Sequence, residues 1–136
     1  MKKPRQSWLI LAAVILLIGI VVGGRYLTEE RLGQRVSMTV PKLSPAAKAG
    51  EAVFVVNCAG CHGMNAAGSD KGPPLVDRIY RPSHHGDFSF VRAVTLGVPQ
   101  HHWLFGAMPA QAQMTREQID QIVTYIREIQ RANGIS

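Results

Sequence analysis

The amino-acid sequence predicts an all-α fold, in which a small helical domain follows one N-terminal membrane-spanning helix. Residues 8–24 are all apolar or glycine, which is typical of a transmembrane helix. Residues 116–132 have the 3.6-residue periodicity of an amphipathic helix, with apolar side chains at Ile119, Ile122, Val123, Ile126 and Ile129. No segment shows the strict alternation of polar and apolar residues that a half-buried strand requires.

The N-terminal segment has the charge pattern of an exported chain. Residues 1–7 are basic and precede the apolar run, and a positive flank stays in the cytoplasm. Arg25 and Tyr26 suit the opposite interface, so we expect the span to cover residues 8–27. Because no Ala-x-Ala site follows the run, we favour a retained single-pass anchor in the cell membrane over a cleaved signal peptide, which remains the alternative. Both place the rest of the chain on the periplasmic or extracellular side.

The remaining segments are predicted from local helix signals. Residues 28–43 mix charged and polar residues and are interpreted as a tether, and residues 44–136 as the folded domain. Ser44 and Pro45 match an N-cap and first helical residue, for a helix from Pro45 to about Cys58. A second helix is expected over residues 88–96, with Asp87 as its cap and Gly97 as its end.

Two finer expectations concern these helices. We expect the 88–96 helix to present one face made by Phe88, Val91, Val94 and Thr95. The final helix is expected over residues 116–132, and the sequence from Thr115 to Gln118 fits a capping box at its start.

The charge distribution argues against a nucleic-acid partner. The chain has a formal net charge of +6, but this excess is concentrated in and beside the N-terminal segment. From Lys42 onward there are 9 basic and 7 acidic residues, which leaves 9 − 7 = +2. The domain also lacks a basic run, so we expect no nucleic-acid binding.

The chemistry-bearing motif is the sequence Cys58-Ala59-Gly60-Cys61-His62, which holds the only two cysteines of the chain. This C-x-x-C-H pattern is typical of covalent haem attachment. Within a helical turn, the two-residue spacer allows each thiol to bond one haem vinyl group, and His62 then points at the iron as its proximal ligand. A redox disulfide lacks the βαβ context, and a zinc site lacks a second cysteine pair. The motif therefore predicts one covalent haem c.

The chain resembles class I c-type cytochromes over residues 44–133. The resemblance rests on the attachment motif, the turn Gly72-Pro73-Pro74-Leu75 and the pair Met108-Pro109 before the last helix. Gly50 and Phe54, together with Tyr125, resemble the crossed terminal helices of that family. The resemblance implies a helical cytochrome c-like domain around one haem, with His62 on one face of the iron, a methionine on the other, and the Pro73 carbonyl behind His62.

The sixth iron ligand is predicted by comparing the methionines. Met64 is too close to His62 to reach the opposite face of the haem, and Met1 and Met38 lie outside the domain core. Met108 stands beside Pro109, as the family pattern asks, and is preferred. Met114 or a histidine remains the alternative.

Two adjacent histidine pairs, His84-His85 and His101-His102, are not needed by this pattern. They can be surface residues or partners of the haem propionates. They can also supply a replacement sixth ligand, or a second site for copper or zinc, since imidazole suits both metals.

These observations predict a membrane-tethered electron carrier rather than an enzyme. Its haem iron is expected to cycle between Fe(III) and Fe(II), with electrons passing to or from an oxidase, reductase or dehydrogenase during brief encounters with redox partner proteins. Two alternatives remain. One is a haem-based gas or redox sensor, and the other is a copper-handling protein that uses the histidine pairs.

Overall fold

The computed structural model describes residues 5–31 and 36–136. In these ranges the regular elements are α-helices and short 3-10 helices, and the single β feature is an isolated antiparallel bridge between Val98 and Met108. The predicted helical fold is therefore confirmed. The chain divides into two units, Met1–Arg31 and Leu32–Ser136, which are described separately below.

The first unit contains one long helix, α1 (Arg5–Arg31). Its segment Trp8–Tyr26 has a mean hydropathy of 2.4 and is long and apolar enough to cross a membrane. A cleavable signal sequence has the same properties. Lys2 and Lys3 of the predicted basic N-terminus lie outside the described residues.

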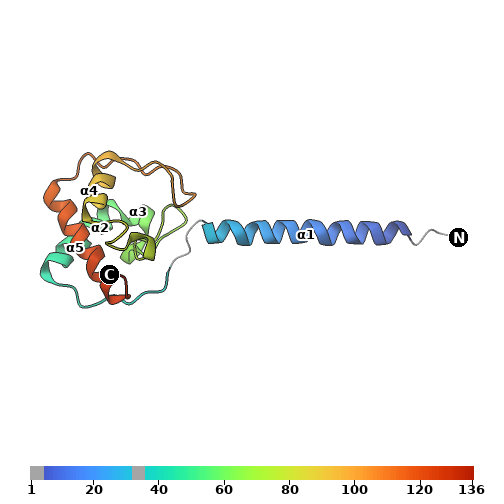
Figure 1. The fold of residues 1–136 in the computed structure, drawn as a ribbon, viewed down its shortest axis with the longest axis horizontal. Coiled ribbons are helices and arrows are strands. Elements are labelled where there is room, and N and C mark those ends of the chain that lie inside the picture. Colours follow the sequence, from blue (N-terminus) through green and yellow to red (C-terminus); the bar gives the residue numbers. More distant parts are fainter. Residues whose placement is uncertain (1–4, 32–35) are drawn as a thin grey trace. The chain divides into compact units, whose positions relative to one another are not determined.

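The second unit is built on the crossing of helices α2 (Pro45–Asn57) and α5 (Arg116–Ala132) (Figure 1). Gly50 lies at the crossing. A Cβ atom added there would lie 2.0 Å from the backbone oxygen of Gln121, so no side chain fits between the two backbones. One turn further along α2, the rings of Phe54 and Tyr125 lie with their centroids 5.4 Å apart. The predicted roles of these residues in the crossing are confirmed.

The N-termini of α2 and α5 carry the caps that the sequence predicts. The side chain of Ser44 accepts a hydrogen bond from the Ala47 N–H at 3.2 Å. It also donates to the carboxylate of Glu128 at 2.6 Å, which ties the start of α2 to α5. Thr115 and Gln118 form the expected capping box at the start of α5. All five residues of the predicted apolar stripe on α5 are buried.

Helix α4 (Asp87–Leu96) differs from the prediction at its N-terminus and on its buried face. Gly86 is the N-cap, and Asp87 is the first helical residue. Its carboxylate accepts from the Nε of Arg127 at 2.8 Å, so the prediction that Asp87 caps the helix was wrong. Phe88 is 74% exposed, and the buried residues of α4 are Phe90, Val91 and Val94. Val91 and Val94 of the predicted face are therefore buried as expected, whereas Phe88 and Thr95 are exposed and Phe90 takes their place in the core.

The segment before α2 lies on the second unit. The Val36 N–H donates to the Ala67 carbonyl at 3.0 Å. Thr39 and the Asn133 side chain exchange two hydrogen bonds of 2.8 Å, and Leu43 is buried. This segment was assigned to the tether from the sequence, and its described part, from residue 36 onward, packs on the folded unit. The tether residues 32–35 lie outside the described part of the chain.

Candidate cofactor site

The attachment motif occupies a short helical turn, α3 (Ala59–His62), directly after α2. The His62 N–H donates to the Cys58 carbonyl at 2.9 Å, and the Gly63 N–H donates to the Ala59 carbonyl at 2.9 Å. This hydrogen bonding fixes the spacing of the two thiols and the imidazole. Cys58 is half-buried, Cys61 is exposed, and both are free thiols. Burial, together with the neighbouring Cys61, raises the pKa of Cys58 to about 11, so Cys58 is a neutral thiol near pH 7.

A glycine-rich loop, including the 3-10 helix η1 (Met64–Ala66), folds back on this turn and places a carbonyl behind His62. The Gly68 N–H donates to the His62 carbonyl at 2.7 Å, and a Cβ on Gly72 would lie 2.9 Å from the Cys61 oxygen. The loop thereby places the Pro73 carbonyl 2.9 Å from His62 Nδ1. A carbonyl only accepts, so Nδ1 carries the hydrogen and Nε2 has a free lone pair. Burial lowers the pKa of His62, against the opposing effect of the Pro73 hydrogen bond, which favours this neutral ligand form.

Met108 is held by the loop that follows α4. Val98 and Met108 exchange two backbone hydrogen bonds of 2.9 Å each. Gly97 ends α4 with a φ of 75°, and a Cβ there would lie 2.6 Å from the Met108 carbonyl oxygen. The backbone of Met108 is therefore positioned by the end of α4. The other methionine considered for this role, Met114, packs partly buried against the core.

These residues meet around a cavity of about 500 Å³, a size typical of cofactor sites. Cys58, His62, Pro73 and Met108 line it. Its remaining wall is mainly apolar and includes Phe54, Leu75, Val94, Ile119, Ile122, Val123 and Ile126. A thiol, an imidazole and a thioether around one apolar cavity are the donor set that covalent haem uses. The residues present therefore fit a haem group. Met114 and Cys61 do not line the cavity.

Sequence reasoning missed two residues that form or support the polar edge of the cavity: Tyr80 lines the cavity, and Arg127 lies outside the lining and bonds to the backbone of Tyr80 and His85. Tyr80 lies in the 3-10 helix η2 (Arg78–Tyr80), and its hydroxyl oxygen accepts from Trp103 Nε1 at 3.1 Å. Burial raises the pKa of Tyr80 to about 12. Arg127 is 6% exposed and donates to Asp87 and to the carbonyls of Tyr80 and His85. The sequence offered one signal that Arg127 is buried, because it follows Val123 of the apolar stripe by about one helical turn.

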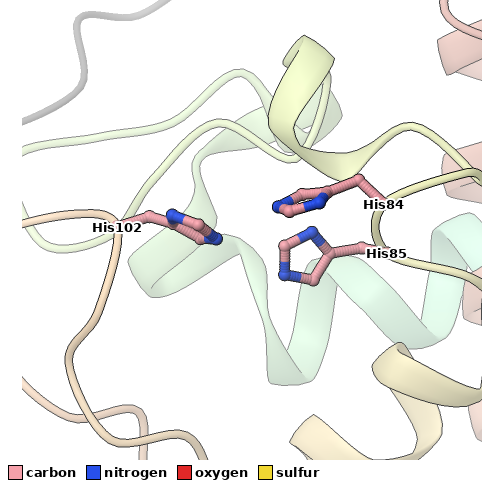
Figure 2. A group of neighbouring side chains, drawn as sticks. All are labelled: His84, His85 and His102. Atoms are coloured by element: carbon pink, nitrogen blue, oxygen red, sulfur yellow. The ribbon is translucent and has the colours of Figure 1, made fainter.

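The histidine pairs, far apart in the sequence, come together at this same edge (Figure 2). His84, His85 and His102 each offer one ring nitrogen within 4.8 Å of those of the other two. His101 lies next to them, with its ring centroid 4.3 Å from that of His102. Burial lowers the pKa of His102, and the neighbouring histidines, of which His101 has the largest effect, lower it further, which favours its neutral form. The sequence identified the four histidines, but not that three of them converge.

Comparison with known proteins identifies the family. The sequence model described as cytochrome c matches residues 47–130, more than half of the chain. Among solved structures, the chain is similar to cytochrome cL of the marine methylotrophic bacterium Methylophaga aminisulfidivorans MPT. The identity is 31% and the TM-score 0.46, and the match covers 60% of this chain and 53% of that protein. The chain thus matches about half the length of that structure. A search of curated proteins gives no significant match. On the extent of the family match, together with the attachment motif and the cavity, the chain belongs to the cytochrome c family, which carries covalently bound haem c and transfers electrons.

Proposed function

We propose that the chain is a membrane-tethered, single-haem electron carrier in which His62 and Met108 are the axial ligands of the iron. Cys58 and Cys61 form the thioether bonds in this assignment, and Pro73 orients His62. The observation that carries the proposal is that His62 and Met108 line the same cavity as Cys58.

The bound haem supplies a one-electron Fe(III)/Fe(II) couple, and a histidine and methionine ligand pair raises its potential. The residues of the chain tune and protect that couple. Pro73 holds His62 through the 2.9 Å contact and makes the imidazole a stronger donor. The bridge from Val98 holds Met108 within the same cavity. The buried side chains of α5 exclude water from the cavity, which favours the less charged ferrous centre.

The test of the ligand assignment is the optical spectrum of the oxidised holoprotein. A ferric haem with a methionine sulfur ligand has a weak charge-transfer band at the red end of the spectrum. We expect the wild type and Met114→Leu to show this band and Met108→Leu to lose it. Both substitutions replace a partly buried methionine with a residue of similar volume, so they differ mainly in which methionine is removed. Loss of the band in Met114→Leu alone would overturn the assignment.

The same spectrum separates the carrier from the gas-sensor alternative. A wild-type protein without the band, whose reduced form binds carbon monoxide rapidly, would have an open sixth position and act as a sensor. Persistence of the band, with slow carbon monoxide binding, supports the carrier.

The cellular arrangement is part of the proposal and rests on α1. We propose that Trp8–Tyr26 spans the cell membrane with the haem unit on the periplasmic or extracellular side, where it meets its redox partner proteins. The full-length chain should fractionate with membranes and resist extraction by alkaline carbonate. Recovery of a shortened, soluble chain from wild-type cells would instead identify α1 as a cleaved signal sequence. The carrier assignment does not depend on this outcome.

Copper or zinc binding at the histidine pairs is not required for electron transfer, and the comparisons lend it no support. Only the geometry of the histidine cluster bears on it.

A further inference from the structure

The edge of the cavity contains a cluster of imidazoles that the electron-carrier function does not use. His84 and His85 follow η2, and His102 comes from the loop after α4. Figure 2 shows the ring of His102 pointing from one side toward the rings of His84 and His85 on the other. The ring centroid of His102 lies 5.5 Å from that of His84 and 5.3 Å from that of His85. Two sequence-distant segments therefore direct three imidazoles toward one point.

The separations are close to those of a bound metal site. One ring nitrogen from each of the three histidines lies within 4.8 Å of the other two. Nitrogens that share one tetrahedral zinc ion lie about 3.3 Å apart, given metal–nitrogen distances of about 2.0–2.1 Å. Small rotations of the three side chains are enough to close this difference, since His84 and His102 are exposed and have room to move.

The hydrogen bonds of the cluster leave a metal-binding nitrogen free. His85 Nδ1 lies 2.8 Å from the Ile79 carbonyl, which can only accept, so Nδ1–H donates and Nε2 keeps its lone pair. This is the arrangement that metal-ligating histidines usually have, with the second ring nitrogen bonded to a backbone carbonyl. The contact therefore fixes both the ring orientation and the tautomer that a metal ion needs.

The two segments are also held in place before any metal binds. Buried Arg127 donates to the carbonyls of Tyr80 and His85 and so fixes the turn that bears the first histidine pair. Trp103, next to His102, donates to the Tyr80 hydroxyl at 3.1 Å, which links the second segment to the first. A site whose ligands are held by such contacts loses less conformational entropy on binding.

We propose that His84, His85 and His102 form a binding site for one borderline divalent transition-metal ion, Cu²⁺ or Zn²⁺, separate from the haem iron. Three neutral imidazoles suit both ions, and Cu²⁺ binds such ligands more tightly than Zn²⁺. Water completes the coordination. His101 lies beside the site and is not a ligand. The proposal concerns metal binding alone and does not depend on the electron-carrier assignment.

The test is equilibrium dialysis of the oxidised holoprotein, purified without a polyhistidine tag, against Zn²⁺ and, in a separate arm, Cu²⁺. Bound zinc or copper is counted per haem by elemental analysis. We expect about one metal ion per chain in each arm, with tighter binding of Cu²⁺. The variants His84→Gln, His85→Gln and His102→Gln should each weaken binding by more than about 100-fold, because removal even of a supporting partner costs 10–100-fold.

His101→Gln is the matched control, because it makes the same substitution in the adjacent residue of the same exposed loop. It should bind metal nearly as well as the wild type. An unchanged haem spectrum in all four variants will show that each is folded. The proposal is overturned if the wild type takes up no metal, or if His102→Gln and His101→Gln bind it equally. Either result would assign the histidines to the polar edge of the haem cavity alone.

Discussion

The two sides of the cavity are built in different ways. On one side His62 belongs to a helical turn whose hydrogen bonds join residues four apart, from His62 N–H to Cys58 and from Gly63 N–H to Ala59. On the other side Met108 belongs to a loop, and its backbone is fixed by a bridge to Val98 at the end of α4. The first side is therefore determined by local spacing, and the second by contacts between separate segments. The substitutions below test each side in turn.

The largest expected effect is on the helical side, at the crossing of α2 and α5. Gly50→Ala places a Cβ 2.0 Å from the backbone oxygen of Gln121, which can move only if the helices separate. We expect the free energy of unfolding of the holoprotein to fall by about 3 kcal/mol, the upper part of the range for overpacking, in a denaturant titration. Gly60→Ala is the control, because nothing lies within 4 Å of its added Cβ. Equal stability of the two variants would contradict the close crossing.

The next effect concerns Arg127, which holds the turn at residues 80–85 that forms the polar edge of the cavity. Arg127→Met removes the donor to the His85 carbonyl and one donor to the Tyr80 carbonyl, together with the ion pair to Asp87. We expect a loss of about 2 kcal/mol, since a buried acceptor left without a partner costs about 1–3 kcal/mol. Arg131→Met, on the exposed face of the same helix, should change stability by less than about 0.5 kcal/mol. Hydrogen exchange should show faster exchange around residues 80–85 in the first variant, and no difference there would argue against the anchoring role.

A smaller effect is expected at Gly97. Comparison with Gly106 separates the backbone strain of an alanine substitution from its effect on the position of Met108. Gly97 and Gly106 both have positive φ, 75° and 88°, so alanine at either costs about 1 kcal/mol in backbone strain. Only at Gly97 does the added Cβ also approach Met108, at 2.6 Å from its carbonyl oxygen. We expect both variants to lose stability from strain, Gly97→Ala the more because of this added clash, and Gly97→Ala alone to weaken the red charge-transfer band. An unaffected band in Gly97→Ala would show that the end of α4 does not position Met108.

The smallest effect is pH-dependent. Hydrogen bonds from the Ser44 side chain and N–H lower the pKa of Glu128. A lowered folded-state pKa means that the carboxylate stabilises the fold above its unfolded pKa of about 4.3. This stabilisation is lost as the pH falls through the folded-state value. Because Glu128 is only partly buried, Glu128→Gln should cost less than about 1 kcal/mol at pH 7. The difference from the wild type should shrink below about pH 4, and a difference that does not change with pH would contradict this role.

The features that could be predicted from the sequence are those determined by local spacing, and the features that could not are those determined by contacts between separate segments. The capping box at Thr115, the cap at Ser44 and the C-x-x-C-H turn depend on residues within one or two helical turns, and all three are present. The buried face of α4 was predicted correctly at Val91 and Val94 and incorrectly at Phe88 and Thr95. The first turn of α4 is bonded at Asp87 by Arg127, forty residues away, and such a distant contact cannot be read from the local periodicity. The histidine pairs were visible as residues, but their convergence depends on how two loops pack, which no local pattern encodes.

The contrast between local and distant contacts also implies an order of events in the making of the protein. The turn that bears Cys58, Cys61 and His62 needs only its own few residues, whereas the α2–α5 crossing joins residues as far apart as Ser44 and Glu128, 84 positions along the chain. Contacts between residues so far apart form slowly, because the chain between them must close into a loop first. A chain that is still emerging therefore presents the attachment motif well before it can close the helix pair. The Cys58 thiol is therefore more accessible in the open chain than in the folded unit, where it is half-buried.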